Sequence, residues 1–205
     1  MSRLTADTIF AAGQELVRET GWSTLSLRGV AARLGVTPMA LYRHVADGAA
    51  LTNGVIASIV AEFAVAERTG DARADLATWA SVARSALREY PGAAGQLLIS
   101  WFEVPTMLQC TEGLLRIVHD DGLRGFEAVA AVNAVVMYVL MRCEAEQTVR
   151  SAGAVKRALR LAAAETPLPH LTALAPHYTT ARFDLHFDYG LDVLLNGIAA
   201  RQVRS

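Results

Sequence analysis

The amino-acid sequence predicts an all-α protein, with a small three-helix domain joined by a long helix to a larger helical domain. Apolar residues recur at helical spacing along most of the chain, and Gly and Pro cluster at the ends of these segments. No run of alternating β-branched residues is long enough to require a strand. With 205 residues, 53% of them hydrophobic, the chain can bury one good core or two small ones. We expect the first domain over residues 1–47, the connecting helix over 48–68 and the second domain over 69–205.

The first domain is expected to begin with a helix over residues 5–20, which Gly21 ends. Next comes the segment SLRGVAARLGVTPMALYRHV, which covers residues 26–45 and predicts two short helices joined by a tight turn. Ser26 can accept from the free N–H groups that open the first of these helices, and Gly35 supplies the left-handed residue that ends it.

The second short helix is expected to begin at Pro38, with Thr37 as its cap. An apolar set lets the two helices pack at a steep angle: Val30, Ala31, Leu34, Val36, Leu41 and Val45. This arrangement is a helix-turn-helix, whose second helix lies in the major groove of DNA. Seven residues are expected on or near its exposed side: Thr37, Pro38, Met39, Ala40, Tyr42, Arg43 and His44.

Arg43 is the side chain of this helix that can bind guanine O6 and N7 with two hydrogen bonds. Met39 and Ala40 can offer only apolar contacts, for example to a thymine methyl group. The formal charge is −1 for the whole chain, and residues 1–50 carry five Arg against four acidic residues. Affinity for DNA must therefore come from a few placed contacts, doubled by symmetry, and not from a broad basic surface.

Asp47 can cap the connecting helix, along which apolar residues keep helical spacing as far as Ala66. Further helices are expected over residues 74–90, 105–121, 124–150 and 181–203, with a shorter one after Pro91 that ends at residue 101. Residues 165–178 contain three of the six prolines, so we expect an irregular connection there.

The second domain is expected to bind a small, largely apolar effector through large, adaptable side chains. The candidates are Phe63, Trp79, Trp101, Phe102, Met107, Cys110, Asn133, Met137 and Tyr138. Most of these residues fit an ordinary core equally well. Asn133 is the most informative, since an amide within an apolar run needs a partner, which is the effector, a neighbouring helix or a second subunit.

A homodimer is expected from the mean hydropathy of +0.28, which is high for a soluble protein and suggests apolar surface covered by a second copy. The helices over 124–150 and 181–203 would pair with their symmetry mates in a four-helix interface. The proposed dimerisation residues form a stripe on the last helix: Phe183, Phe187, Leu191, Leu194 and Ile198.

The three short helices, of which the last carries LYRHV and leads through Asp47 into a longer helix, resemble the N-terminal domain of the tetracycline-repressor (TetR) family of transcriptional regulators. The resemblance covers roughly residues 4–66, and FDYGLDVLLNGIAA at 187–200 resembles the last helix of such regulators. It implies a repressor that binds double-stranded operator DNA and releases it when a small effector binds.

The resemblance also implies roles for individual residues. Tyr42 and His44 match family positions that bind phosphate, and Arg28 matches one that touches the DNA backbone or an outer base. The family usually has a lysine at the start of its fourth helix, where this chain has Gly48. The backbone N–H groups there can still receive a phosphate, but a charge-assisted contact is missing.

Other classes of function find little support. The five histidines lack metal-site spacing, and there is neither a glycine-rich phosphate loop nor a GxSxG motif, so we expect no metal, no cofactor and no enzymatic activity. The longest apolar run, over residues 128–141, is shorter than the roughly 18 residues that span a bilayer, so we expect a cytoplasmic protein without membrane contact. The alternative is an all-helical small-molecule binding protein or enzyme with a vestigial helix-turn-helix.

Overall fold

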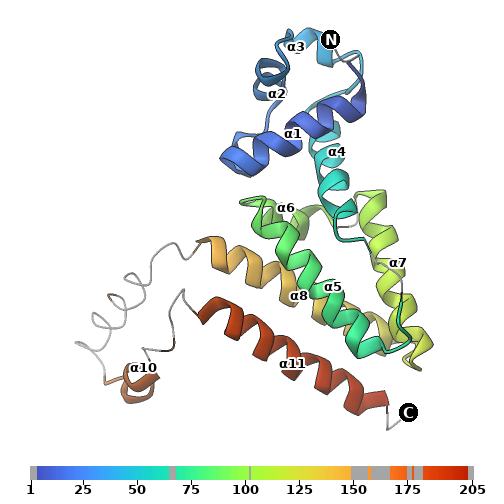
Figure 1. The fold of residues 1–205 in the computed structure, drawn as a ribbon, viewed down its shortest axis with the longest axis vertical. Coiled ribbons are helices and arrows are strands. Elements are labelled where there is room, and N and C mark those ends of the chain that lie inside the picture. The colour runs from blue at the N-terminus through green and yellow to red at the C-terminus, as the bar shows by residue number, and fades with distance from the viewer. Residues whose placement is uncertain are drawn as a thin grey trace.

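Short helices build the N-terminal domain in the computed structural model. The structure describes residues 4–64, 68–101, 103–148, 157, 167–174, 177 and 182–202. The domain comprises α1 (Ala6–Thr20), a 3-10 turn η1 (Trp22–Thr24), α2 (Leu27–Leu34) and α3 (Pro38–Leu41), and α4 (Gly48–Ala61) leads out of it. The described part of the chain contains helices and no strand, which confirms the all-α prediction. Figure 1 shows α2 and α3 at one end of an elongated molecule.

Helix α1 lies against α4 at a close crossing. Gly54 on α4 faces the ring of Phe10, and a Cβ built on Gly54 would lie only 2.2 Å from that ring. At Gly13 on α1, a Cβ would lie 2.7 Å from Val55. Two glycines therefore bring the helices together, so that α4 is held firmly by the N-terminal domain.

The second domain packs around α8 (Gly125–Thr148), which contacts its neighbours on several sides. These neighbours are α5 (Ala72–Arg88), α6 (Ala93–Ser100), α7 (Pro105–Asp120) and α11 (Phe183–Gln202). Helix α4 reaches this domain by packing on α7, and α11 lies beside α8 and α5 (Figure 1). The domain boundaries, after residue 47 and after residue 68, stay predictions. Helix α4 does connect the two helical groups, as expected.

Two boundaries differ from the sequence-based expectation. Helix α4 ends at Ala61, although the apolar spacing predicted a helix to residue 68. Phe63, just beyond the helix end, is still fully buried, so apolar spacing alone did not reveal that the helix stops. Within 165–178, residues Pro169–Leu174 form the short helix α10, since Pro is well tolerated at the first helical position; much of that segment lies outside the described residues.

By length and composition, helix α8 is long and apolar enough to cross a membrane, with 24 residues and a mean hydropathy of 1.6 in its most hydrophobic window, although the length of the apolar run over residues 128–141 predicted otherwise. Of its most hydrophobic window, 44% is buried inside the protein. Because α8 packs against α5, α6, α7 and α11, its hydropathy is that of a core helix with one exposed apolar side.

Candidate functional site

The helix-turn-helix forms through the local signals that the sequence contains. The Ser26 hydroxyl accepts from the Gly29 N–H at 3.1 Å, and Gly35 ends α2 in the left-handed conformation with φ 67°. Asp47 accepts from the Ala50 N–H at 2.8 Å and so caps α4. Thr37 precedes α3 in extended conformation but makes no capping bond with its side chain, which leaves its hydroxyl available to a ligand.

Residues 37–44 form the reading segment, in which α3 occupies the first half and a turn the second. Leu41 is fully buried and anchors the segment to the domain core. Met39 is 71% exposed and Tyr42 50% exposed. The structure places all the other predicted DNA-binding residues at the surface as well: Arg28, Thr37, Pro38, Arg43, His44 and Gly48 are exposed and Ala40 is half-buried.

The arginines of this domain fall into two groups. Arg33 forms ion pairs with Glu19 at 2.6 Å and Glu15 at 3.0 Å, so acidic groups already occupy its guanidinium. Arg28 and Arg43, in contrast, are exposed and form no ion pair with any described residue. The unpaired positive charge of residues 4–64 therefore lies on the helix-turn-helix, where phosphates and base edges can approach.

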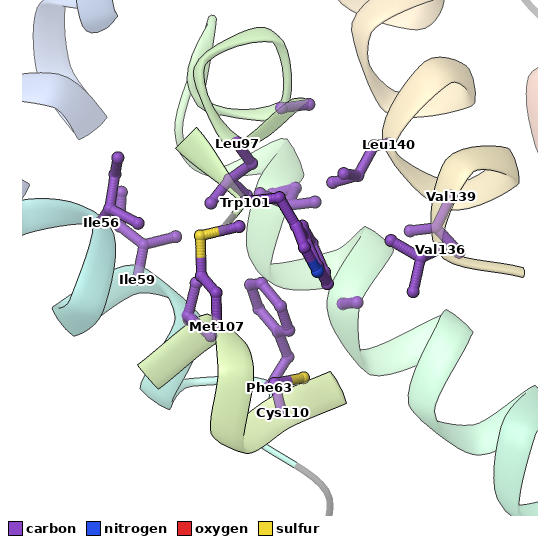
Figure 2. Packing of buried hydrophobic residues seen from close by; sticks show 14 of the residues in the cluster. Ile56, Ile59, Phe63, Leu97, Trp101, Met107, Cys110, Val136, Val139 and Leu140 are labelled. Atoms are coloured by element: carbon purple, nitrogen blue, oxygen red, sulfur yellow. The ribbon is translucent and has the colours of Figure 1, made fainter. Parts of the chain in front are cut away.

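Five of the predicted effector-binding residues converge in the second domain and form what we term the aromatic cluster: Phe63, Trp79, Trp101, Met107 and Cys110. None of the five is more than 5% exposed. They come from the end of α4, from α5, from the end of α6 and from α7. Figure 2 shows apolar residues of α4, α6 and α8 around four of them, Phe63, Trp101, Met107 and Cys110. The rings of Phe63 and Trp79 meet edge to face, with centroids 6.3 Å apart.

The two indoles of the cluster differ in their hydrogen bonding. Trp101 Nε1 donates to the Thr111 hydroxyl at 2.9 Å. Trp79 Nε1 is buried and has no oxygen or nitrogen acceptor among the described residues; the only acceptor that it faces is the weakly accepting Cys110 thiol. Burial raises the pKa of the Cys110 thiol to about 11, and a weak hydrogen bond from the Trp79 side chain lowers it to a smaller extent. The thiol is therefore protonated at neutral pH and provides only a weak acceptor.

The remaining predicted effector residues do not join the aromatic cluster. Asn133 and Met137 are exposed on the far side of α8, so the expected partner of the Asn133 amide is not a neighbouring helix of the same subunit. Tyr138 packs on Phe187, and its hydroxyl donates to the carbonyls of His186 and Phe187. Phe102 lies outside the described residues.

The stripe proposed for dimerisation is divided by the structure. Phe187 and Leu191 are 1% and 5% exposed, because α8 and α5 of the same subunit already cover them. Both side chains therefore belong to the core of their own subunit, and the proposed dimer interface rests on other residues. Phe183, Leu194 and Ile198 are half-buried, and Leu194 and Ile198 line a groove of about 580 Å³ between α8 and α11.

A different set of apolar residues is exposed around that groove, and we term it the outer face of α8 and α11. Small residues, Ala130 and Ala134 of α8 and Gly197 of α11, form part of the groove wall. The outer face comprises Phe126, Val129, Asn133, Met137 and Met141 of α8 with Leu185, Tyr189 and Val193 of α11. Phe126 is 84% exposed and Tyr189 75% exposed, so the described part of the subunit leaves these large apolar side chains mostly uncovered.

Both cysteines are buried free thiols. Burial raises the pKa of Cys143 to about 12, so it stays protonated at neutral pH, as Cys110 does. Within the described ranges, no group of three or more His, Cys, Asp or Glu side chains lies close enough together to hold a metal ion.

Comparison with known proteins decides the family. Residues 64–202 match the model of the tetracyclin repressor-like C-terminal domain. Over 209 aligned residues the chain is 30% identical to the class A tetracycline repressor protein from transposon 1721 of Escherichia coli, with 99% of this chain and 94% of the relative covered. The chain belongs to the tetracycline-repressor family of transcriptional regulators.

Solved structures of the TetR family share the fold along the whole chain. A possible TetR family transcriptional regulator from Streptomyces coelicolor A3(2) matches with a TM-score of 0.83 at 26% identity, covering 95% of this chain and 98% of the other. A variant of TetR from Acinetobacter baumannii AYE, solved in complex with minocycline, matches with a TM-score of 0.73 at 26% identity, covering 98% and 99%. The family comprises transcriptional regulators, so an enzyme with a vestigial helix-turn-helix loses its support.

Sequence reasoning missed a polar cluster between the two domains, formed by Gln14 and Arg18 of α1, Glu62 at the end of α4, and Tyr90 after α5. The Tyr90 hydroxyl donates to Glu62 and accepts from Gln14 at 2.7 Å and from Arg18. Burial, followed by the hydrogen bond to Glu62, raises the pKa of Tyr90 to about 12, so the hydroxyl keeps its proton. Because Arg18 and Tyr90 are 72 residues apart, no local pattern could have linked them.

Proposed function

We propose that this TetR family member is a homodimeric repressor that binds an operator through the reading segment and releases it when a small effector enters the aromatic cluster. The observation that carries the proposal is the exposed reading segment, in which Arg43 is unpaired and Leu41 is anchored in the core. Such a regulator acts in the cytoplasm, where its operator DNA lies, and we assign it no enzymatic activity.

A dimer is needed because one reading segment offers few contacts. Pairing of two outer faces would cover their large apolar side chains and bring four helices, α8 and α11 from each subunit, together. Two reading segments would then contact half-sites about 34 Å apart on one face of the DNA, or near a multiple of that spacing.

The route from effector to DNA follows side-chain contacts between the two domains. Phe63 lies two residues beyond the end of α4 and packs edge to face on Trp79, so a molecule that enters the aromatic cluster meets the end of α4. Near that end, Tyr90 bonds α1, and the Trp22 N–H donates to the Pro91 carbonyl at 2.7 Å. An effector that binds the DNA-free arrangement more tightly would shift both contacts together and change the half-site spacing.

Arg43→Ala is expected to weaken sequence-specific binding to the DNA upstream of the protein's own gene. A bidentate arginine contact to guanine is worth about 1–3 kcal/mol, and the dimer loses two, so affinity should fall about 30-fold or more. The measurement is a gel shift at several salt concentrations, with Arg116→Ala on α7 as an exposed arginine control. A wild-type protein that shows no specific shift even at low salt would contradict the proposed function.

Gly48→Lys is expected to tighten operator binding. Gly48 is exposed in the first turn of α4, and no atom lies within 4 Å of a Cβ built there, so a lysine fits without strain and reaches toward a phosphate. Two added phosphate contacts should steepen the slope of log affinity against log salt by about 2. Gly48→Ala controls for the loss of glycine flexibility; an affinity of Gly48→Lys no higher than that of Gly48→Ala would count against the contact.

A further inference from the structure

The aromatic cluster contains one polar group that the protein satisfies poorly. Trp79 is 5% exposed, and its Nε1–H is buried without an oxygen or nitrogen acceptor among the described residues; it faces only the weakly accepting Cys110 thiol. A buried donor without a good acceptor is uncommon and destabilises a fold, so it calls for a reason. The other indole N–H of the cluster, that of Trp101, is satisfied by Thr111.

The members of the aromatic cluster are uncharged. They include no ionisable side chain that is charged at neutral pH, since burial keeps the Cys110 thiol protonated. The other residues that Figure 2 labels, around Phe63, Trp101, Met107 and Cys110, are aliphatic: Ile56, Ile59, Leu97, Val136, Val139 and Leu140. A charged molecule would lose its hydration here without gaining a counter-ion.

The shapes of the side chains restrict the molecule further. Phe63 and Trp79 present an edge and a face to each other, an arrangement that aromatic rings of a ligand can extend. Met107 is fully buried between α4 and α6 (Figure 2), and a methionine can change rotamer to admit such a ring.

We propose that the effector of this regulator is an uncharged, flat, largely apolar molecule with an acceptor oxygen that receives the hydrogen bond of Trp79 Nε1. The inference rests on the proposed function, because it takes the aromatic cluster as the effector site. Ring contacts with Phe63 and Trp101 would give most of the affinity, and the hydrogen bond to Trp79 would select oxygenated ligands over plain hydrocarbons of the same shape.

The test compares 9-fluorenone with fluorene, two flat molecules that differ by a carbonyl oxygen. Wild-type protein is expected to bind fluorenone about fivefold more tightly than fluorene, as measured by isothermal titration. In Trp79→Phe this preference should fall to about onefold, because the donor is gone while the ring stays. Trp22→Phe, which changes the indole of η1 outside the aromatic cluster, serves as the matched control and should keep the preference.

A second measurement does not depend on the folding of Trp79→Phe. The chain has three Trp, so ¹H–¹⁵N spectra contain three indole N–H signals, which Trp22→Phe and Trp101→Phe assign by difference. Fluorenone should move the Trp79 signal downfield, as a new hydrogen bond does, and fluorene should not. An unmoved Trp79 signal in the fluorenone complex, or a preference for fluorenone that survives Trp79→Phe, overturns the inference.

Parallel gel shifts distinguish a failure of the proposed ligand class from a failure of the proposed function. If neither probe binds while the protein still shifts its operator, the ligand class is wrong and the proposed regulator remains. If the operator is not bound either, the proposed function itself fails.

Discussion

Val193→Asp is expected to convert the protein to a monomer and to remove detectable operator binding. Val193 is 55% exposed on the outer face and lines the groove between α8 and α11. In the proposed dimer the substitution places an unpaired carboxylate into an apolar interface twice, which costs several kcal/mol of association free energy. Because each monomer offers a single reading segment, operator affinity should fall by at least about 100-fold.

Light scattering coupled to size exclusion measures the mass, and a gel shift measures operator binding. Val82→Asp on α5, which changes a 43% exposed valine, is the matched control and should leave both unchanged. Phe187→Asp provides a contrast, since Phe187 is 1% exposed and the Arg84 guanidinium lies 4.3 Å from its ring centre. That variant should lose its fold, and not merely its partner. A Val193→Asp protein that remains a dimer refutes this interface.

The helix-turn-helix was predictable because its signals are local. Ser26 and Asp47 cap helices through bonds to residues three positions away, and Gly35 ends α2 by its own conformation. Neither signal depends on the rest of the fold, so a short segment of sequence is enough to predict both.

The division of α11 was not predictable from the same kind of reasoning. This helix is apolar on two sides, and spacing alone does not tell which side faces the subunit's own core. The stripe through Phe187 and Leu191 faces α8 and α5, whereas Tyr189 and Val193 face outward. Likewise the sequence predicted a partner for the Asn133 amide, but not that Asn133 lies on the exposed side of α8, which depends on how the helices assemble.

Ion pairs between residues distant in sequence could not be predicted from the sequence either. Arg84 of α5 bonds Glu146 of α8 at 2.9 Å and Asp184 of α11 at 2.8 Å. The Arg84 and Glu146 side chains are only 9% and 6% exposed. Arg84 and Glu146 are 62 positions apart, so nothing in either local segment indicates the pair. This ion-pair cluster joins α5, which carries Trp79, to the two helices of the proposed dimer interface.

Glu146→Gln is expected to destabilise the fold by about 3–5 kcal/mol, because it leaves buried guanidinium groups without their carboxylate. Arg88 at 3.5 Å and Arg142 at 3.8 Å share Glu146 with Arg84, so one substitution weakens three pairs. For a chain of this size the loss corresponds to a fall in Tm of about 6–20 °C, measured by thermal unfolding. Asp184 still faces Arg84 and Arg88, but its side chain is 68% exposed. Because solvent screens its charge, Asp184 replaces only part of the interaction that Glu146 provides.

Glu112→Gln is the matched control for this prediction. Glu112 and Arg116 lie 3.7 Å apart with side chains 66% and 60% exposed, so breaking their pair should cost about 1 kcal/mol or less. If the destabilisation of Glu146→Gln comes from an uncompensated charge, Arg84→Met in the same chain should reduce it, because the charge that lacks a partner is then removed too. Equal Tm values for Glu146→Gln and Glu112→Gln would mean that burial adds nothing to the ion-pair cluster, and the link between α5 and the outer-face helices would have to be apolar.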